Sequence, residues 1–212
     1  MDPATAGGAV NQRPRRVHRV GLRPLLRRDI VPLRNALASA TVAETTRRFF
    51  PRSLPSILDW YDHLRESREI SSFAIVCDDG FIGFCSLRAP IFSGRELAIA
   101  IFDPRYHGLG IGTFAVSKIC QFGFGHLRLP RIELGAYPTN HRGLACYTRC
   151  GFRHEALLRR FLYHEGAWRD VILMSLLRGE WNKQQPSGFM AGEDRNRTYQ
   201  SPIGDQLILK TS

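Results

Sequence analysis

The sequence has 212 residues, of which 43% are hydrophobic and 23% charged, so it can form one large globular domain without disulfide or metal staples. Its apolar runs fall far short of the ~20 residues that a membrane-spanning helix needs, and its start, rich in Gly, Ala and Arg, is unlike a secretory signal. The formal net charge of +11 indicates a negatively charged partner or cofactor, but dispersed arginines and the lack of a recognition motif argue against nucleic acid.

The five cysteines also exclude several kinds of site. Their number is odd, no Cys-x-x-Cys pair occurs and the spacings match no zinc site, so we expect reduced thiols, a cytoplasmic location and no bound metal. Cys146 and Cys150 lie four residues apart on a predicted helix and can touch, but His and carboxylate partners at a metal-binding spacing are missing.

Composition divides the chain into three regions. Residues 1–16 are predicted to be a flexible basic arm, residues 17–182 the folded domain, and residues 183–212 a C-terminal tail that loses the apolar patterning. The end of the tail, residues 206–209, can add a strand to a sheet, either in this chain or in a neighbouring subunit. The second arrangement would make the protein a homodimer.

Within the domain, hydrophobic periodicity predicts an alternation of strands and helices. Asp29 is the expected N-cap of the first helix, and Gly151 the expected left-handed cap of the last. The predicted elements are a strand over 17–25, helices over 30–40 and 54–66, strands over 72–77, 81–87 and 96–102, a helix over 112–127, a strand over 131–136, a helix over 140–150, and strands over 156–163 and 168–177. This order predicts an α/β fold, a mixed sheet with helices on its faces.

The segment from Asp103 to Thr113 carries the strongest functional signal. A predicted strand enters it and an amphipathic helix leaves it, with glycines at 108, 110 and 112. Glycines let the backbone approach an anion closely, and the following helix offers unpaired N–H groups. The segment therefore predicts a phosphate-binding loop, although a glycine-rich turn alone is also common between a strand and a helix. A Rossmann site would need Gly-x-Gly-x-x-Gly in a parallel unit, and a P-loop would need Gly-Lys-Ser/Thr.

A second segment makes this loop more specific. Ala136-Tyr137-Pro138-Thr139-Asn140 and the run from Tyr147 to Phe152, taken with the glycine loop, resemble the GNAT superfamily of acyl-CoA acyltransferases. The resemblance covers about residues 17–181, and the closing stretch from Gly166 to Trp181 is similar to the RimJ/RimL branch. It implies the GNAT fold, a central, mostly antiparallel sheet that is splayed at the cofactor site and has helices on both faces.

The resemblance also implies which residues bind the cofactor. In the family a Q/R-x-x-G-x-G/A loop binds the pyrophosphate of CoA, a later Asn contacts the pantetheine arm, and the strand before the loop offers backbone groups. His107 departs from the usual Gln or Arg, but the backbone amides remain. The matching positions here are Ile101, Phe102, His107, Gly108, Leu109, Gly110, Ile111, Gly112, Thr113 and Asn140. Asn140 also suits a helix N-cap, which is compatible with contact to the cofactor.

Two residues are candidates for proton transfer. Tyr147 matches the family's general acid, whose hydroxyl protonates the departing CoA thiolate, although many RimJ-like proteins lack this Tyr. Glu96 matches a position where relatives often carry Glu, and a carboxylate facing a groove there can take a proton from the amine. The alternatives are a buried Tyr bonded to the backbone and a surface Glu at a strand edge.

With these residues, the resemblance implies an N-acetyltransferase that uses acetyl-CoA and no metal, with direct attack of a primary amine on the thioester. A cysteine intermediate is not expected, because no neighbouring His would activate Cys146 or Cys150. Three readings of the function stay open: acetylation of a protein N-terminal amine, acetylation of a small amine such as a polyamine, antibiotic or amino sugar, and acyl-CoA binding without turnover.

Overall fold

The computed structural model describes residues 17–37, 53–67, 70–78, 80–164, 166–184 and 207–210. The predicted basic arm, most of the C-terminal tail and the end of the first predicted helix lie outside these residues. The strands are β1 Val17–Pro24, β2 Ser71–Cys77, β3 Gly80–Arg88, β4 Arg95–Ile101, β5 Arg131–Ala136, β6 Arg153–His164, β7 Ala167–Leu177 and β8 Leu207–Lys210. The helices are α1 Ile30–Leu37, α3 Leu54–Glu66, α4 Ile111–Gln121, α5 His141–Arg149 and α6 Arg178–Gln184.

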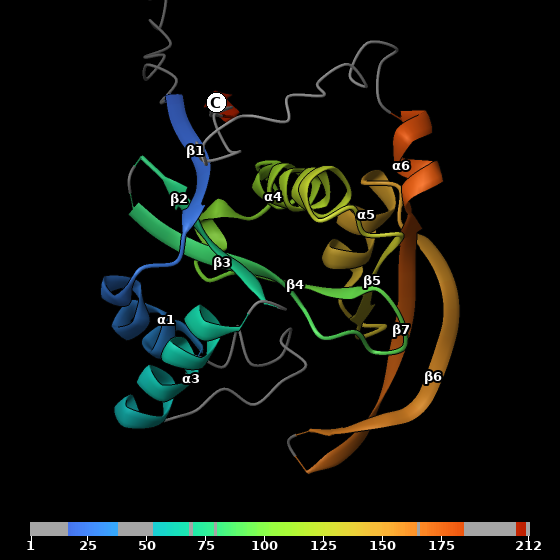
Figure 1. Ribbon diagram of the computed structural model, residues 1–212, viewed down its shortest axis with the longest axis horizontal. Coiled ribbons are helices and arrows are strands. Elements are labelled where there is room, and N and C mark those ends of the chain that lie inside the picture. The colour runs from blue at the N-terminus through green and yellow to red at the C-terminus, as the bar shows by residue number, and fades with distance from the viewer. Residues whose placement is uncertain are drawn as a thin grey trace, which may run out of the picture.

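The described strands form a single mixed sheet, as predicted, in the order β6-β7-β5-β4-β3-β2-β1-β8 (Figure 1). Neighbouring strands are antiparallel except β4 and β5, which run parallel. The predicted strand at 206–209 is found as β8, and it pairs with β1 of its own chain.

Helices cover both faces of this sheet (Figure 1). On one face, α1 and α3 bury Leu33, Ile57 and Tyr61 against Ala74 and Phe84. On the other face, α4 supplies an apolar stripe to a larger core, whose fully buried members include Ile75, Leu87, Ile111, Ala115, Ile119, Ile132, Leu134 and Leu176. These two cores fix the sheet as the middle layer of the domain.

Among the described strands, one neighbouring pair is parallel; it is short, and it determines where the site lies. β4 and β5 are paired only through Arg95 with Ile132 and Glu96 with Glu133. Both strands continue beyond these pairs, to Ile101 and Ala136, but they are no longer paired with each other there. The sheet therefore splays between β4 and β5, as the GNAT resemblance implies.

Two local predictions need correction. Asp29 does not cap α1, because it closes a 3-10 turn over Arg27–Asp29 and its carboxylate accepts the N–H of Leu26 at 2.8 Å. The helix predicted over 112–127 keeps α-helical geometry only to Gln121 and continues as a π segment, Phe122–His126. Gly123 lies in this segment, where a Cβ would meet Ile132 Cδ1 at 2.8 Å, so the change of winding lets the helix end pack tightly on the sheet.

Candidate functional site

The glycine loop lies where β4 ends at the splay. His107 Nε2 is 3.0 Å from the carbonyl oxygen of Ile101, and because a carbonyl only accepts, Nε2 donates and holds the loop to the strand end. Gly108 and Gly110 adopt positive φ angles of 78° and 81°, and no heavy atom lies within 4 Å of a Cβ built on either. The backbone of this loop is therefore open to a ligand, in a conformation that other residues adopt only with strain.

Helix α4 starts directly after this loop, with Gly110 as its N-cap. No side chain caps this end, and the N–H groups of the first turn have no acceptor within the helix. Those N–H groups and the helix dipole give the end roughly half a positive charge. The loop and the helix start together can bind an anion such as a phosphate.

Asn140 joins the site from the other side of the splay. Its side chain caps α5 by accepting the N–H of Gly143 at 2.9 Å, as the sequence predicts. Gly151 ends the same helix region with a φ of 90°, the predicted left-handed cap. Both caps fix α5 across from α4, so that the two helices and the end of β4 enclose a space.

This space is a cavity of about 700 Å³, open to solvent. Most of the predicted site residues line it together: Ile101, His107, Gly108, Leu109, Gly110, Gly112, Thr113, Asn140 and Tyr147. Two of the predicted cofactor-binding residues have side chains that point elsewhere. Ile111 is fully buried in the core, and the Phe102 ring packs edge-on against Phe81, 5.4 Å between centroids. Only their backbone groups remain as candidates for cofactor contact.

Tyr147 is the only predicted proton-transfer residue that lines the cavity. It projects from α5 and lies against the ring of Phe152, with 6.2 Å between centroids. The Phe152 N–H donates to the Tyr147 carbonyl at 3.1 Å, which ties the end of α5 to the start of β6. The ring is thus held between the helix end and the cavity.

Glu96 is placed differently from the prediction. Its side chain is only 1% exposed, and it accepts two hydrogen bonds of 3.0 Å from the Nε and Nη2 atoms of Arg88. The expected open groove around this carboxylate is therefore not found. Leu97 packs into the core below α4, so the alternation along β4 turns Glu96 to the opposite face.

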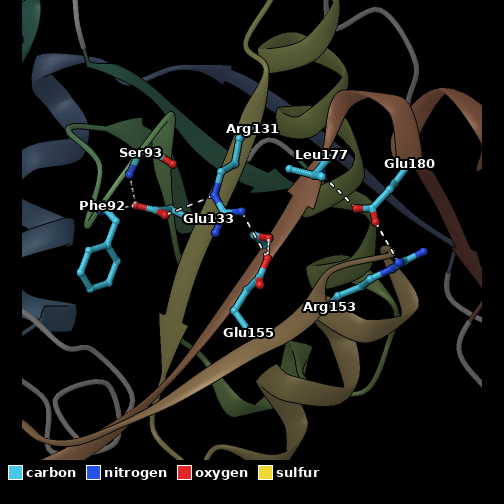
Figure 2. A network of polar contacts seen from close by, with 9 residues as sticks. Phe92, Ser93, Arg131, Glu133, Arg153, Glu155, Leu177 and Glu180 are labelled. Carbon is cyan, nitrogen blue, oxygen red and sulfur yellow. Dashed lines mark hydrogen bonds and ion pairs between the residues drawn. The ribbon is translucent and has the colours of Figure 1, made fainter.

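A second buried carboxylate, Glu133, lies beside Glu96, and it belongs to a polar network that joins β5 and β6 (Figure 2). Glu133 accepts the N–H groups of Phe92 and Ser93 at 2.7 and 3.2 Å. Arg131 Nε lies 3.5 Å from Glu133 Oε2, and Arg131 Nη1 lies 3.2 Å from Glu155 Oε1, so Arg131 links β5 to β6. The network holds the connection between β3 and β4 against β5, at the closed end of the splay.

Sequence reasoning missed several residues of the cavity wall. Tyr106, Phe114, Ser117, Arg142, Cys146 and Arg149 also line it. The two arginines are seven residues apart on α5 and therefore lie on one helix face, a spacing that could have indicated a positive wall for an anionic cofactor. Among the described residues, no group of three or more His, Cys, Asp or Glu side chains is arranged to hold a metal ion. No helix in the described part of the chain is long and apolar enough to cross a membrane.

Comparison with known proteins bears directly on this cavity. Residues 19–153 match the family model described as acetyltransferase (GNAT) domain. Spermidine N(1)-acetyltransferase of Escherichia coli is 26% identical over 166 residues, 77% of this chain and 89% of that protein. The putative ribosomal N-acetyltransferase YdaF of Bacillus subtilis is 28% identical over 130 residues, 61% of this chain and 70% of that protein.

Solved structures show the same architecture. Spermidine N-acetyltransferase from Vibrio cholerae, in complex with CoA and spermine, superposes with a TM-score of 0.70 at 22% identity, covering 77% of this chain and 98% of that one. RimJ from Mycobacterium smegmatis, in complex with CoA-disulfide, superposes with a TM-score of 0.67 at 26% identity, covering 76% of this chain and 83% of that one.

Proposed function

This chain belongs to the GNAT acetyltransferase family and is an N-acetyltransferase that uses acetyl-CoA, and we propose that its acceptor is the N-terminal amine of a protein. The observation that carries this choice is the pairing of Glu96 with Arg88. An α-amine has a pKa near 7.7–8.0 and is partly neutral at neutral pH, whereas an alkyl amine such as that of lysine, near 10.4, must lose a proton first. A site whose strand carboxylate is already paired suits the amine that needs the weaker base.

Charge supports the same choice. The chain carries a net charge of +11, and a polyamine is itself a polycation. Binding of several ammonium groups favours carboxylates that are not already occupied. The two carboxylates at the paired end of β4 and β5, Glu96 and Glu133, each have an arginine partner. A protein acceptor with acidic residues near its N-terminus would instead be attracted by the net positive charge of this chain.

We assign the cofactor-binding roles as the sequence predicts them and add two arginines of α5 that line the cavity. The amides of residues 107–113 and the start of α4 hold the pyrophosphate, helped by Arg142 and Arg149 on the facing helix. Asn140 and the backbone of Ile101 and Phe102 contact the pantetheine arm. Several bonds to charged oxygens of roughly 1.5–3 kcal/mol each are sufficient to hold a pyrophosphate without a lysine.

The chemical step in this proposal uses few side chains. The site orients the neutral amine toward the thioester carbonyl, so the reaction gains from proximity. Backbone N–H groups stabilise the oxyanion, and the Tyr147 hydroxyl donates a proton to the leaving sulfur. A phenol of pKa near 10 and a thiol near 8.5 are close enough for this transfer. The amine proton leaves to water, since Glu96 is occupied by Arg88.

A small-amine acceptor is the second candidate, favoured by the E. coli spermidine acetyltransferase, which this chain matches over 89% of that protein's length. Parallel assays with different acceptors distinguish the protein acceptor from the small-amine acceptor. Release of the CoA thiol is measured with peptides that have a free N-terminal amine, and with spermidine, an aminoglycoside and an amino sugar. Turnover of peptides alone supports the proposal, and turnover of spermidine alone replaces it with the polyamine reading.

The expected location is the cytoplasm. All five cysteines are free, and none is placed in a disulfide. Free thiols are the usual state in a reducing compartment, where acetyl-CoA and new protein N-termini are both present.

A further inference from the structure

One cysteine differs from the other four in its surroundings. Cys146 is half-buried and lines the cavity, whereas Cys77, Cys85, Cys120 and Cys150 are buried. Cys146 projects from α5 toward the first turn of α4. Its Sγ lies 3.6 Å from Thr113 Oγ1 and would lie 3.4 Å from a Cβ added at Gly112. A thiol therefore faces the helix end that we assign to the cofactor's pyrophosphate.

The same surroundings stabilise the thiolate form of Cys146. A hydrogen bond from Cys150 has the largest effect and lowers the pKa of Cys146. Burial raises this pKa, whereas the Thr113 hydroxyl and the Arg149 charge lower it further, and the result is a pKa of about 7. The start of α4 contributes positive potential at the same place. In contrast, burial raises the pKa of the Cys85 and Cys120 thiols well above the ordinary range.

We propose that Cys146 is a modification site, at which a low-molecular-weight disulfide forms a mixed disulfide that closes the cavity to acetyl-CoA. The inference rests on the proposed function of the cavity and adds a means of control to it. Cys146 is the one thiol of the chain that is both in contact with this cavity and close to a helix start, a partly exposed, positively charged environment that favours thiolate chemistry.

The exchange balances without any further reagent. The Cys146 thiolate attacks one sulfur of the disulfide, and a new S–S bond forms as the reagent's S–S bond breaks. The other half leaves as a thiolate, so Cys146 is oxidised and the leaving sulfur is reduced. A reducing thiol reverses the step, attacking the mixed disulfide and restoring the free side chain.

Modification and cofactor binding should exclude each other. A group attached to Cys146 occupies part of a cavity of about 700 Å³ and covers the loop amides next to Gly112 and Thr113. Bound acetyl-CoA in turn places its phosphates at the same helix start, which shields the thiol and removes the positive potential that stabilises the thiolate. Acetyl-CoA has no free thiol, so it can protect Cys146 without reducing the reagent.

The test uses the full chain and the aromatic disulfide DTNB, whose released thiolate is followed by absorbance. We expect one thiol per chain to react more than about tenfold faster than the rest, because thiolate character and access decide the rate. Saturating acetyl-CoA should slow that thiol, modification should abolish acetyl-CoA binding, and dithiothreitol should restore it. A fast thiol mapped by mass spectrometry to another cysteine, or full acetyl-CoA binding after modification of Cys146, overturns the inference.

Variants make the assignment specific. Cys146→Ser should lose the fast phase, and whatever acetyl-CoA binding it has should be unchanged by DTNB. Cys77→Ala, which changes a cysteine outside the cavity lining, should keep the fast phase. If Cys146→Ser does not fold, mass mapping of the wild-type chain still decides the identity of the thiol. Absence of acetyl-CoA binding before any treatment contradicts the proposed function instead, so the two failures are distinguishable.

Discussion

The guanidinium of Arg88 and the carboxylate of Glu96 form a paired contact between β3 and β4, with both hydrogen bonds at 3.0 Å. The two residues are also direct cross-strand neighbours. The carboxylate is almost completely buried, and its charge is balanced within the protein rather than by water. Glu96 is therefore held as a structural partner at the closed end of the splay. The sequence predicts it as the base, whereas our proposal sends the amine proton to water, and a Glu96 variant tests which of the two holds.

Replacing Glu96 separates these roles. Glu96→Gln leaves the Arg88 charge, whose side chain is 15% exposed, without its partner, so we expect the free energy of unfolding to fall by about 3 kcal/mol. The shape of the pH–rate profile should not change. Loss of the acidic limb of that profile would show instead that Glu96 is the base. Glu155→Gln is the matched control, since Glu155 forms a more exposed pair with Arg131 and its loss should cost less than about 1 kcal/mol.

Tyr147→Phe tests the general acid. Removal of the hydroxyl should lower kcat by about 100-fold with little change in the KM for acetyl-CoA, because general acid catalysis contributes roughly that factor. Steady-state kinetics on a slow-reacting peptide gives both constants. Tyr163→Phe, which changes an exposed tyrosine on β6, should leave both unchanged. An unaltered kcat in Tyr147→Phe would remove Tyr147 from the mechanism.

The glycine loop can be tested with three alanine variants of similar backbone geometry. Gly108, Gly110 and Gly166 have φ angles of 78°, 81° and 75°, and a Cβ meets no atom within 4 Å at any of them. Each Gly→Ala change should cost about 1 kcal/mol of stability through backbone strain. Only Gly108→Ala and Gly110→Ala should also weaken acetyl-CoA binding, measured by calorimetry. Equal binding in all three variants would exclude this loop as the phosphate site.

Asp29 predicts how stability depends on pH. Burial alone would raise its pKa, but hydrogen bonds from Arg23 at 2.6 and 2.8 Å and from the Leu26 N–H outweigh this, and the pKa of Asp29 is lowered in the folded protein. The ionised carboxylate therefore stabilises the fold above the unfolded pKa of about 3.9, and this stability is lost as the pH falls through the lower, folded pKa.

Urea unfolding of the wild type and of Asp29→Asn checks this sign. At pH 7 the variant should be less stable by about 3 kcal/mol, as expected for breaking a buried pair. The difference should shrink as the pH falls below about 4, where Asp29 of the unfolded wild-type chain takes up a proton while the folded carboxylate is still ionised, and it should be lost below the folded pKa. A difference that is constant from pH 7 to pH 3 would mean that the ionisation of Asp29 does not contribute.

Features set by local chemistry could be predicted from the sequence. The glycine spacing of residues 108–112 predicted the loop, Asn140 and Gly151 predicted both ends of α5, and alternating runs predicted the strands that build the sheet. In each case the residue types that specify the conformation lie within a few positions of one another, so the information is present in one short segment.

Features that depend on distant partners could not be predicted in this way. The surroundings of Glu96 depend on the register of β3 against β4, which brings Arg88 opposite it. The π segment after Gln121 depends on the close approach of Gly123 to Ile132, and the contact of Cys146 with Thr113 depends on the packing of α5 against the start of α4. These are pairings between segments, and no single segment carries their pattern.

The most direct test of the central claim compares two forms of one peptide as acceptors. The peptide carries acidic residues after its first residue and an internal lysine, and it is used with its N-terminus free and with its N-terminus already acetylated. Release of CoA from acetyl-CoA is measured for both. We predict release with the free α-amine and none with the blocked form. Equal release from both forms, or release only with spermidine in place of either peptide, would contradict acetylation of protein N-termini.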